Sequence, residues 1–181
     1  MARTLEVRRH SIRKSGGGSQ LSQAGVDLAR RVGADMGPFD LVVASPAPRA
    51  RETAVAMGFA VDHELARLTA EEEAYAELEA ARHWEASQPM AALAAVIARR
   101  GAAWRLGMGF AALWRDLLTP LADGSAALVI SHSADVEMGL IAAFPDADHA
   151  SWGGEFRHCE GARLTFAGAL PRFNDVQLIR I

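Results

Sequence analysis

The sequence contains a single cysteine, Cys159, among its 181 residues. One thiol cannot form a disulfide bond within the chain, and it cannot build a cysteine-based zinc or iron–sulfur site. Scarce cysteine is typical of proteins from a reducing compartment. The sequence also lacks histidine pairs of the form His-x-x-x-His and clustered aspartates. We therefore expect neither a metal site nor a cofactor.

The sequence has no excess of positive charge and no long apolar run. Nineteen Lys and Arg stand against 22 Asp and Glu, which disfavours a protein that binds nucleic acid by neutralising phosphates. The first ten residues contain no apolar stretch of signal-peptide length. The longest apolar stretch, Pro89 to Ala98, ends at Arg99 and Arg100 before it reaches membrane-spanning length. We expect a cytoplasmic protein that binds neither nucleic acid nor membranes.

The glycine-rich segment, residues 15–19, lacks the surroundings that a nucleotide-binding loop needs. No Gly-Lys-Ser/Thr follows it, which excludes a P-loop, and Leu21 stands where a dinucleotide-binding fingerprint has a glycine. We expect this segment to be a flexible surface loop.

The rest of the sequence alternates between strand and helix patterns. Strands are expected at Thr4 to Arg9, Asp40 to Ser45 and Ala126 to Ser131, with weaker candidates at Arg163 to Phe166 and Val176 to Ile181. Helices are expected at Ser22 to Gly33, Pro48 to Gly58, Glu71 to Trp84, Met90 to Arg100, Phe110 to Leu118 and Ser133 to Phe144. The alternation predicts one domain over residues 1–181, a three-layer α/β/α fold with a mainly parallel central sheet.

Two of the predicted strands run directly into a histidine. His10 follows the first strand and His132 follows the strand that ends at Ser131, while Arg49 comes soon after the strand between them. Ligands bind outside the carboxyl ends of strands in open parallel sheets, so these three side chains are expected to meet in one cleft. Arg9 and Arg13 flank His10 and would add two more guanidinium groups.

This combination of groups suits a phosphoryl substrate. Guanidinium groups are permanently charged and match tetrahedral oxyanions, while a neutral imidazole can attack phosphorus without a metal. Each residue also has a plainer interpretation, because a lone histidine at a strand end is usually packed or solvent-facing, and the arginines could be a solvated rim. The joint occurrence at three strand ends favours a site. The other four histidines, including His158, have no comparable context and are assigned no role.

Four sequence segments, in order, resemble motifs of the histidine phosphatase superfamily, whose fold is called phosphoglycerate-mutase-like. Arg9-His10 resembles the superfamily's Arg-His-Gly signature, and Leu21-Ser22-Gln23-Ala24-Gly25 is similar to Leu-Thr-x-x-Gly. The segment 45–54, Ser-Pro-Ala-Pro-Arg-Ala-Arg-Glu-Thr-Ala, resembles Ser-Pro-x-x-Arg-Ala-x-Gln-Thr-Ala and is the most specific of the four. Val129-Ile130-Ser131-His132 resembles the Val-Ser-His segment.

The resemblance implies a role for each matching residue. His10 would be the nucleophile that forms a phosphohistidine, and His132 the second imidazole that contacts the phosphoryl group. Arg9, Arg13 and Arg49 would bind the phosphate. The chain departs from the signature at two positions, where Ser11 and Ser133 stand in place of glycine. Both serines would add side chains near the phosphate and so affect substrate preference.

The general acid that protonates the leaving group is the least determined residue. The superfamily often places a glutamate shortly after an Arg-Leu pair, and Arg67-Leu68 is followed by Glu71, Glu72 and Glu73. Glu71 is the first choice by spacing, although a glutamate run at a helix start usually faces solvent. Asp135, one helical turn beyond His132, is the reserve candidate.

The favoured function is a metal-independent phosphatase that hydrolyses a phosphomonoester or phosphohistidine through a phosphohistidine intermediate on His10. Its substrate would be a phosphorylated small molecule or a phosphoprotein. A phosphoglycerate-type mutase uses the same core, and a non-catalytic module that binds phosphate or a partner is a third alternative. The sequence leaves the substrate and the oligomeric state open.

Overall fold

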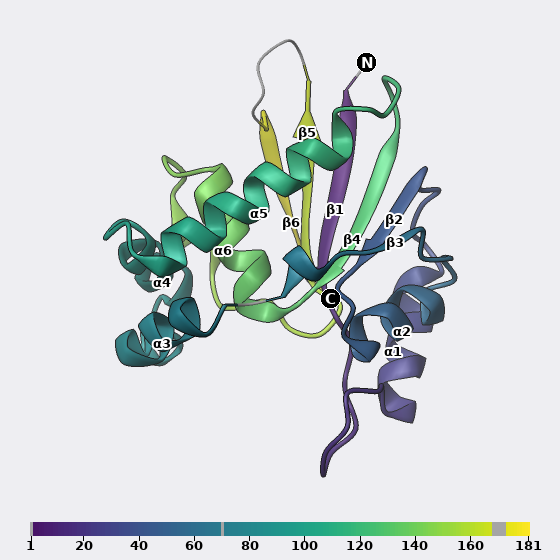
Figure 1. Ribbon diagram of the computed structural model, residues 1–181, viewed down its shortest axis with the longest axis horizontal. Coiled ribbons are helices and arrows are strands. Elements are labelled where there is room, and N and C mark those ends of the chain that lie inside the picture. The colour runs from purple at the N-terminus through teal and green to yellow at the C-terminus, as the bar shows by residue number, and fades with distance from the viewer. Residues whose placement is uncertain (1, 70, 168–172) are drawn as a thin grey trace.

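The computed structural model describes residues 2–69, 71–167 and 173–181. Six strands form one sheet in the order β3-β2-β4-β1-β5-β6, and helices lie on both sides of it (Figure 1). Strands β1, β2, β3 and β4 are parallel to one another, whereas β5 pairs antiparallel with β1 and β6 pairs antiparallel with β5 at one edge. The predicted three-layer fold with a mainly parallel sheet is confirmed.

The strands are β1 (Arg3–Arg9), β2 (Leu41–Ala44), β3 (His63–Glu64), β4 (Ala126–Ser131), β5 (Gly161–Phe166) and β6 (Asp175–Ile179). The helices are α1 (Gln23–Gly33), α2 (Pro48–Ala56), α3 (Glu72–Ala81), α4 (Pro89–Ile97), α5 (Ala102–Leu118) and α6 (Ser133–Ala143). Short 3₁₀ turns occur at Ala66–Leu68, His83–Glu85 and His149–Trp152. Within the described residues, no helix combines the length and the apolar character that crossing a bilayer requires.

Helices α2, α3 and α4 end two or three residues before their predicted ends, and two other elements differ more from the sequence predictions. Helix α5 begins at Ala102, eight residues before the predicted start at Phe110. Gly107 interrupts the helical pattern, but it is needed where α5 packs closely on α6, because a Cβ there would lie 2.6 Å from the carbonyl oxygen of Met138. Strand β3 was not predicted, since its two residues are both exposed and carry no apolar pattern.

The central strand β4 explains why the chain needs two helical layers. Ala127 and Val129 point into the core shared with α3, α4, α5 and α6, while Leu128 and Ile130 point into the core shared with α1 and α2. All four are fully buried. A continuous apolar strand is therefore stable here because both of its faces are covered.

Helix α1 is fixed against the segment that follows β1. The Ser22 hydroxyl caps the helix by accepting a hydrogen bond from the Gly25 backbone N–H at 3.1 Å. A Cβ on Gly25 would lie 2.1 Å from the carbonyl oxygen of Ile12, so only glycine allows this approach. The Leu-Ser-Gln-Ala-Gly segment thus combines a helix cap with a close backbone contact.

The strand register brings the carboxyl ends of three strands to one edge of the sheet. Arg9 of β1 is paired with Ser131 of β4, and Ala44 of β2 is paired with Ile130. The residues that follow, His10 among them, therefore leave the sheet side by side. Figure 1 shows this edge below the strands, between α3 on one side and α1 and α2 on the other.

Candidate active site

Arg49 connects the two histidines that follow β1 and β4. Its Nε donates a hydrogen bond to Nε2 of His10 at 3.0 Å, and its Nη2 donates to Nδ1 of His132 at 3.1 Å. Its remaining terminal nitrogen, Nη1, donates to the hydroxyl of Ser19 at 2.9 Å. One guanidinium thus holds both imidazoles at the positions where their strands end.

The hydrogen-bond partners fix the tautomer of each ring. Nδ1 of His10 lies 2.7 Å from the carbonyl oxygen of Ser11, which can only accept, so Nδ1 carries the proton and Nε2 carries the lone pair. His132 has the opposite arrangement, because its Nδ1 accepts from Arg49 and its Nε2 donates to the Ser45 hydroxyl at 2.9 Å. The unprotonated nitrogen of His10 is therefore the one that faces Arg49.

Both imidazoles are held in the neutral state. The pKa of His10 is lowered to about 3, mainly by burial and also by the nearby His132, Arg49 and Arg9, against a hydrogen bond to Ser11 that raises it. Burial, together with Arg49 and Arg9, lowers the pKa of His132 to about 4. Both rings are therefore neutral at pH 7, which is the form in which an imidazole can act as a nucleophile.

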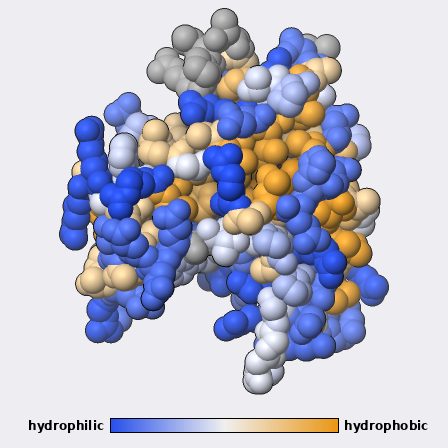
Figure 2. Space-filling model, in the orientation of Figure 1, coloured by the Kyte–Doolittle hydropathy of each residue, from blue (hydrophilic) through white to orange (hydrophobic). Residues whose placement is uncertain are grey.

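These groups line a pocket of about 470 Å³ formed by Arg9, His10, Arg13, Arg49, Thr69, Tyr75, His132, Ser133 and His158. In Figure 2 the surface is hollowed at this edge of the sheet, and the surrounding side chains are mainly hydrophilic. Three guanidinium groups and three imidazoles line the pocket, but no carboxylate among the described residues does. The pocket therefore has a local excess of positive charge that suits an anion.

The three pocket arginines are not paired with carboxylates within the part of the chain that the structure describes, unlike several arginines elsewhere, such as Arg8, Arg163 and Arg180. Burial and the neighbouring Arg13 lower the pKa of Arg49. An anion bound among these like charges would offset the cost of holding them together.

Helices α2 and α6 both begin at this pocket. Arg49 is the second residue of α2, and Ser133 is the first residue of α6, directly after His132. The N-terminus of a helix presents unpaired N–H groups and a partial positive charge. The two helix starts therefore add to the attraction that the guanidiniums exert on an anion.

The structure does not bring the predicted general acid into the pocket. Glu71 precedes α3 as its N-cap residue, and Glu72 and Glu73 form its first turn. All three are exposed, and none lines the pocket. Acidic side chains at this position are favoured by the helix dipole while they remain in solvent, which is the plainer interpretation of the glutamate run.

Asp135, the reserve candidate, has the surroundings of a proton donor. It is fully buried in the first turn of α6, and its carboxylate lies beside the Ser131 hydroxyl and the Tyr75 phenol. Burial raises its pKa to about 7, although Ser131, Arg49 and Tyr75 favour the ionised form. Asp135 does not line the pocket itself, but the neighbouring Tyr75 does.

The two serines that replace signature glycines have different surroundings. Ser133 lines the pocket, as expected. Ser11 does not: it is fully buried, and its hydroxyl donates to the carbonyl oxygen of Gly25 at 2.7 Å. Its backbone N–H donates to the Thr53 hydroxyl at 2.9 Å. Ser11 therefore joins α1 and α2 to the segment after β1 and adds no side chain to the pocket.

Three pocket residues were not found from the sequence. Thr69 and Tyr75 come from the connection between β3 and α3 and from α3 itself, and His158 comes from the loop before β5. The ring of His158 lies 6.0 Å from that of His10, centroid to centroid. None of the three follows a strand directly, so the pattern that identified His10 and His132 does not identify them.

No group of three or more potential metal-ligating side chains occurs among the described residues.

Comparison with known proteins shows similarity in structure. No family model and no curated protein matches the sequence. Phosphoserine phosphatase from Entamoeba histolytica, solved with 3-phosphoglyceric acid, has a TM-score of 0.65 at 14% identity, over 99% of this chain and 98% of that chain. A mycobacterial glucosyl-3-phosphoglycerate phosphatase has a TM-score of 0.63 at 19% identity, over 98% and 97%. Phosphoglycerate mutase from Bacillus anthracis has a TM-score of 0.63 at 15% identity, over 98% and 92%.

The chain has the phosphoglycerate-mutase-like α/β fold, and the structures that it resembles belong to the histidine phosphatase superfamily. The resemblance that the four sequence motifs indicated is confirmed at the level of the fold. Because these structures include both phosphatases and mutases, the fold does not select between the two reactions.

Proposed function

We propose that the protein is a phosphatase that hydrolyses a phosphomonoester through a phosphohistidine on His10. The observation that carries this proposal is the composition of the pocket. It contains the unprotonated Nε2 of His10 together with guanidinium groups that have no carboxylate partner among the described residues. Such an arrangement attracts a dianion and presents a nucleophile to its phosphorus atom. The substrate would be a phosphorylated small molecule or a phosphorylated protein side chain.

In the first step, the hydrogen bond from Nε of Arg49 to Nε2 of His10 is released, and the freed lone pair of Nε2 attacks phosphorus while the bond from phosphorus to the leaving-group oxygen breaks. Arg9, Arg13 and Arg49 stabilise the charge on the equatorial oxygens, and Nδ1 of His132 orients Arg49 by accepting a hydrogen bond from it. In the second step, water attacks phosphorus, the N–P bond breaks, and inorganic phosphate leaves. His10 returns to its neutral form with the proton still on Nδ1.

The leaving-group oxygen needs a proton in the first step, and we propose Asp135 as its source in place of Glu71. A carboxyl group with a pKa of about 7 is protonated in a large share of molecules at neutral pH. The Tyr75 phenol lies beside Asp135 and lines the pocket, so it provides a path for the proton. In the second step the attacking water returns a proton to Asp135.

The simplest test measures hydrolysis of p-nitrophenyl phosphate in the presence of EDTA. The proposal predicts turnover that EDTA does not reduce, and it predicts that His10→Ala abolishes turnover while inorganic phosphate still binds, because the guanidiniums remain. Absence of turnover in the parent protein at every pH, together with phosphate binding, would support a non-catalytic phosphate-binding module instead.

A second test separates a phosphatase from a mutase. A phosphatase discharges the phosphohistidine to water, whereas a mutase transfers the group to a second substrate molecule. Adding 3-phosphoglycerate to the phosphorylated protein should therefore leave the rate of phosphate release unchanged. Formation of a bisphosphorylated or isomerised product would identify mutase activity.

A further inference from the structure

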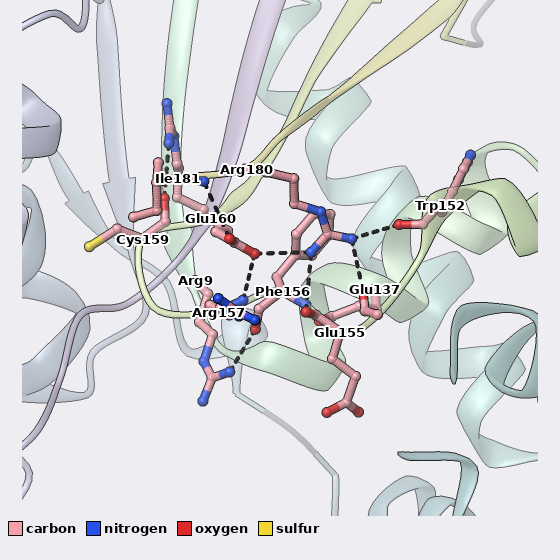
Figure 3. A network of polar contacts seen from close by, with 12 residues as sticks. Arg9, Glu137, Trp152, Glu155, Phe156, Arg157, Cys159, Glu160, Arg180 and Ile181 are labelled. Carbon is pink, nitrogen blue, oxygen red and sulfur yellow. Dashed lines mark hydrogen bonds and ion pairs between the residues drawn. The ribbon is translucent and has the colours of Figure 1, made fainter. Parts of the chain in front are cut away.

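We propose that Arg180, which follows β6, is a positioning residue that fixes Arg9 in the phosphate pocket by holding the loop of residues 152–160. This inference rests on the proposed function, because it assigns Arg9 to phosphate binding. Arg180 itself does not line the pocket. Its influence passes through the peptide backbone of the loop, which Figure 3 shows between Arg180 and Arg9.

The guanidinium of Arg180 binds the loop at four points. Nη2 donates to the carbonyl oxygens of Trp152 and Gly154, each at 2.7 Å. Nη1 donates to the carbonyl oxygen of Glu155 at 3.1 Å and to the carboxylate of Glu160 at 3.0 Å. A planar guanidinium can satisfy several acceptors at once, which a single ammonium group cannot do in the same geometry. Arg180 therefore fixes the conformation of the whole loop, because it donates hydrogen bonds to four of its residues.

The held loop in turn holds Arg9. Nη1 of Arg9 donates to the carbonyl oxygen of Phe156 at 2.6 Å, while Nε of Arg9 has no partner among the described residues. The backbone N–H of the same Phe156 donates to the buried carboxylate of Glu137 at 2.8 Å. The Arg180 guanidinium also stacks over the Phe156 ring, at 4.4 Å from its centroid. Phe156 is thus fixed by contacts on its ring and on its backbone.

Further contacts tie the loop to the strand that carries Arg9. The backbone N–H of Arg9 donates to the carbonyl oxygen of Glu160 at 2.8 Å, and the N–H of Cys159 donates to the carbonyl oxygen of Arg9 at 3.0 Å. The Glu160 carboxylate is almost fully buried and also accepts from the Arg157 backbone N–H at 2.8 Å. His158, which lines the pocket, lies in this same stretch of the loop.

A residue that positions Arg9 affects phosphate affinity, whereas a merely structural residue affects only folding stability. The Arg9 side chain has one observed acceptor, the Phe156 carbonyl, so a shift of that carbonyl would move the guanidinium away from the pocket. Displacement of a binding group by about 1 Å is enough to cost a large factor in rate or affinity. Loss of Arg180 should therefore weaken phosphate binding beyond any effect on folding.

The test compares Arg180→Met with a matched control, Arg163→Met. Arg163 belongs to the neighbouring strand β5 and pairs with the buried carboxylate of Glu6, which keeps its second partner, Arg8, when Arg163 is removed. Both changes remove an arginine from an ion pair with a buried glutamate. Calorimetry with inorganic phosphate should show about tenfold weaker binding for Arg180→Met and unchanged binding for Arg163→Met. Equal affinities in the two variants would overturn the proposal.

A double-mutant cycle with Arg9→Ala tests whether Arg180 affects phosphate binding through Arg9. If Arg180 acts through Arg9, adding Arg180→Met to Arg9→Ala should weaken phosphate binding no further. If the double variant instead loses phosphate affinity by the product of the two single-variant factors, Arg180 does not act through Arg9 and the proposal is contradicted. If Arg180→Met does not fold, Arg180→Lys replaces it in both comparisons under the same criteria.

Phosphate binding also separates this inference from the proposed function. Parent protein that binds phosphate and shows the coupling, but hydrolyses no phosphomonoester, would refute the proposed function and leave the inference standing. Parent protein that binds no phosphate would overturn the inference.

Discussion

The rings of His10 and His132 lie 5.2 Å apart, centroid to centroid, with their planes inclined by 66°. Each ring follows a different strand, and the parallel pairing of β1 with β4 brings them together. Two neutral imidazoles tolerate this distance, whereas two protonated ones would repel each other and Arg49. The folded protein therefore resists protonation at these rings.

Stability should consequently depend on pH through His10. Its folded pKa of about 3 lies below the ordinary value of 6.5, so its contribution is fully present above pH 6.5 and is lost as pH falls toward 3. Compared with His10→Gln, the parent protein should lose about 2 kcal/mol of relative unfolding free energy between pH 7.5 and 5. Urea unfolding at both pH values measures this difference.

The comparison with His10→Gln is necessary because two buried carboxyl groups change the free energy of unfolding with pH in the direction opposite to His10. The pKa values of Asp135 and Glu137 are raised to about 7, mainly by burial, so both groups favour the folded state as pH falls from 7 toward 4. They are present in both proteins and cancel in the difference. An unfolding free-energy difference that stays constant with pH would show that His10 titrates normally.

Arg49→Ala should weaken both phosphate binding and turnover. The change removes the hydrogen bonds that orient both histidines and, under the proposed function, a charge-assisted contact to the phosphate. We expect a loss of about 1.5–3 kcal/mol in phosphate binding, which corresponds to roughly ten- to hundredfold. Arg51→Ala is the control, since Arg51 lies on the same helix but is exposed and pairs with Glu64. Similar losses in the two variants would argue against a specific role for Arg49.

Asp135→Asn should reduce hydrolysis in a way that depends on the leaving group. An alkyl phosphate needs a proton on its leaving oxygen, whereas p-nitrophenolate leaves without one. The variant should therefore lose about 10²–10⁴-fold in kcat with an alkyl phosphate and much less with p-nitrophenyl phosphate. Glu71→Gln should leave both rates nearly unchanged, because Glu71 is exposed and outside the pocket.

The same assignment predicts the pH profile. A general acid must be protonated, so kcat with an alkyl phosphate should fall as pH rises above about 7, and Asp135→Asn should remove this fall. A profile that is identical in the two proteins would exclude Asp135 as the acid.

Gly25→Ala should destabilise the protein by about 1–3 kcal/mol, because the added methyl group meets the Ile12 carbonyl oxygen at 2.1 Å. Gly109→Ala is the matched control. Gly109 lies within α5 with open space where a Cβ would be, so this change should stabilise by about 0.5–1 kcal/mol. Thermal or urea unfolding measures both variants, and equal effects would show that the contact at Gly25 is not tight.

The sequence carried enough information for the fold and the centre of the pocket because both depend on local patterns. Buried strands such as β4 appear as apolar runs, and His10, Arg49 and His132 stand directly after strands. Parallel pairing then places them together without further information. The beginning of α5 was not predicted, since Gly107 is unfavourable in an isolated helix and is required only by the contact with α6.

The remaining parts of the site depend on contacts between distant segments. His158 and Tyr75 enter the pocket from a loop and from a helix face, and no local pattern marks either of them. The glutamate run suggested Glu71 as the acid, yet spacing along the chain does not report which carboxyl group becomes buried. Asp135 becomes buried because α6 packs against the sheet and α5, which only the assembled fold determines.

The central claim is that His10 carries the phosphoryl group during turnover. Rapid quenching of the protein with a phosphomonoester under alkaline denaturing conditions, followed by mass spectrometry, tests it most directly. The account predicts a phosphorylated peptide with the added group on His10, present in the parent protein and absent from His10→Ala. Steady hydrolysis with no phosphorylated protein at any quench time, or with the group on another residue, would contradict it.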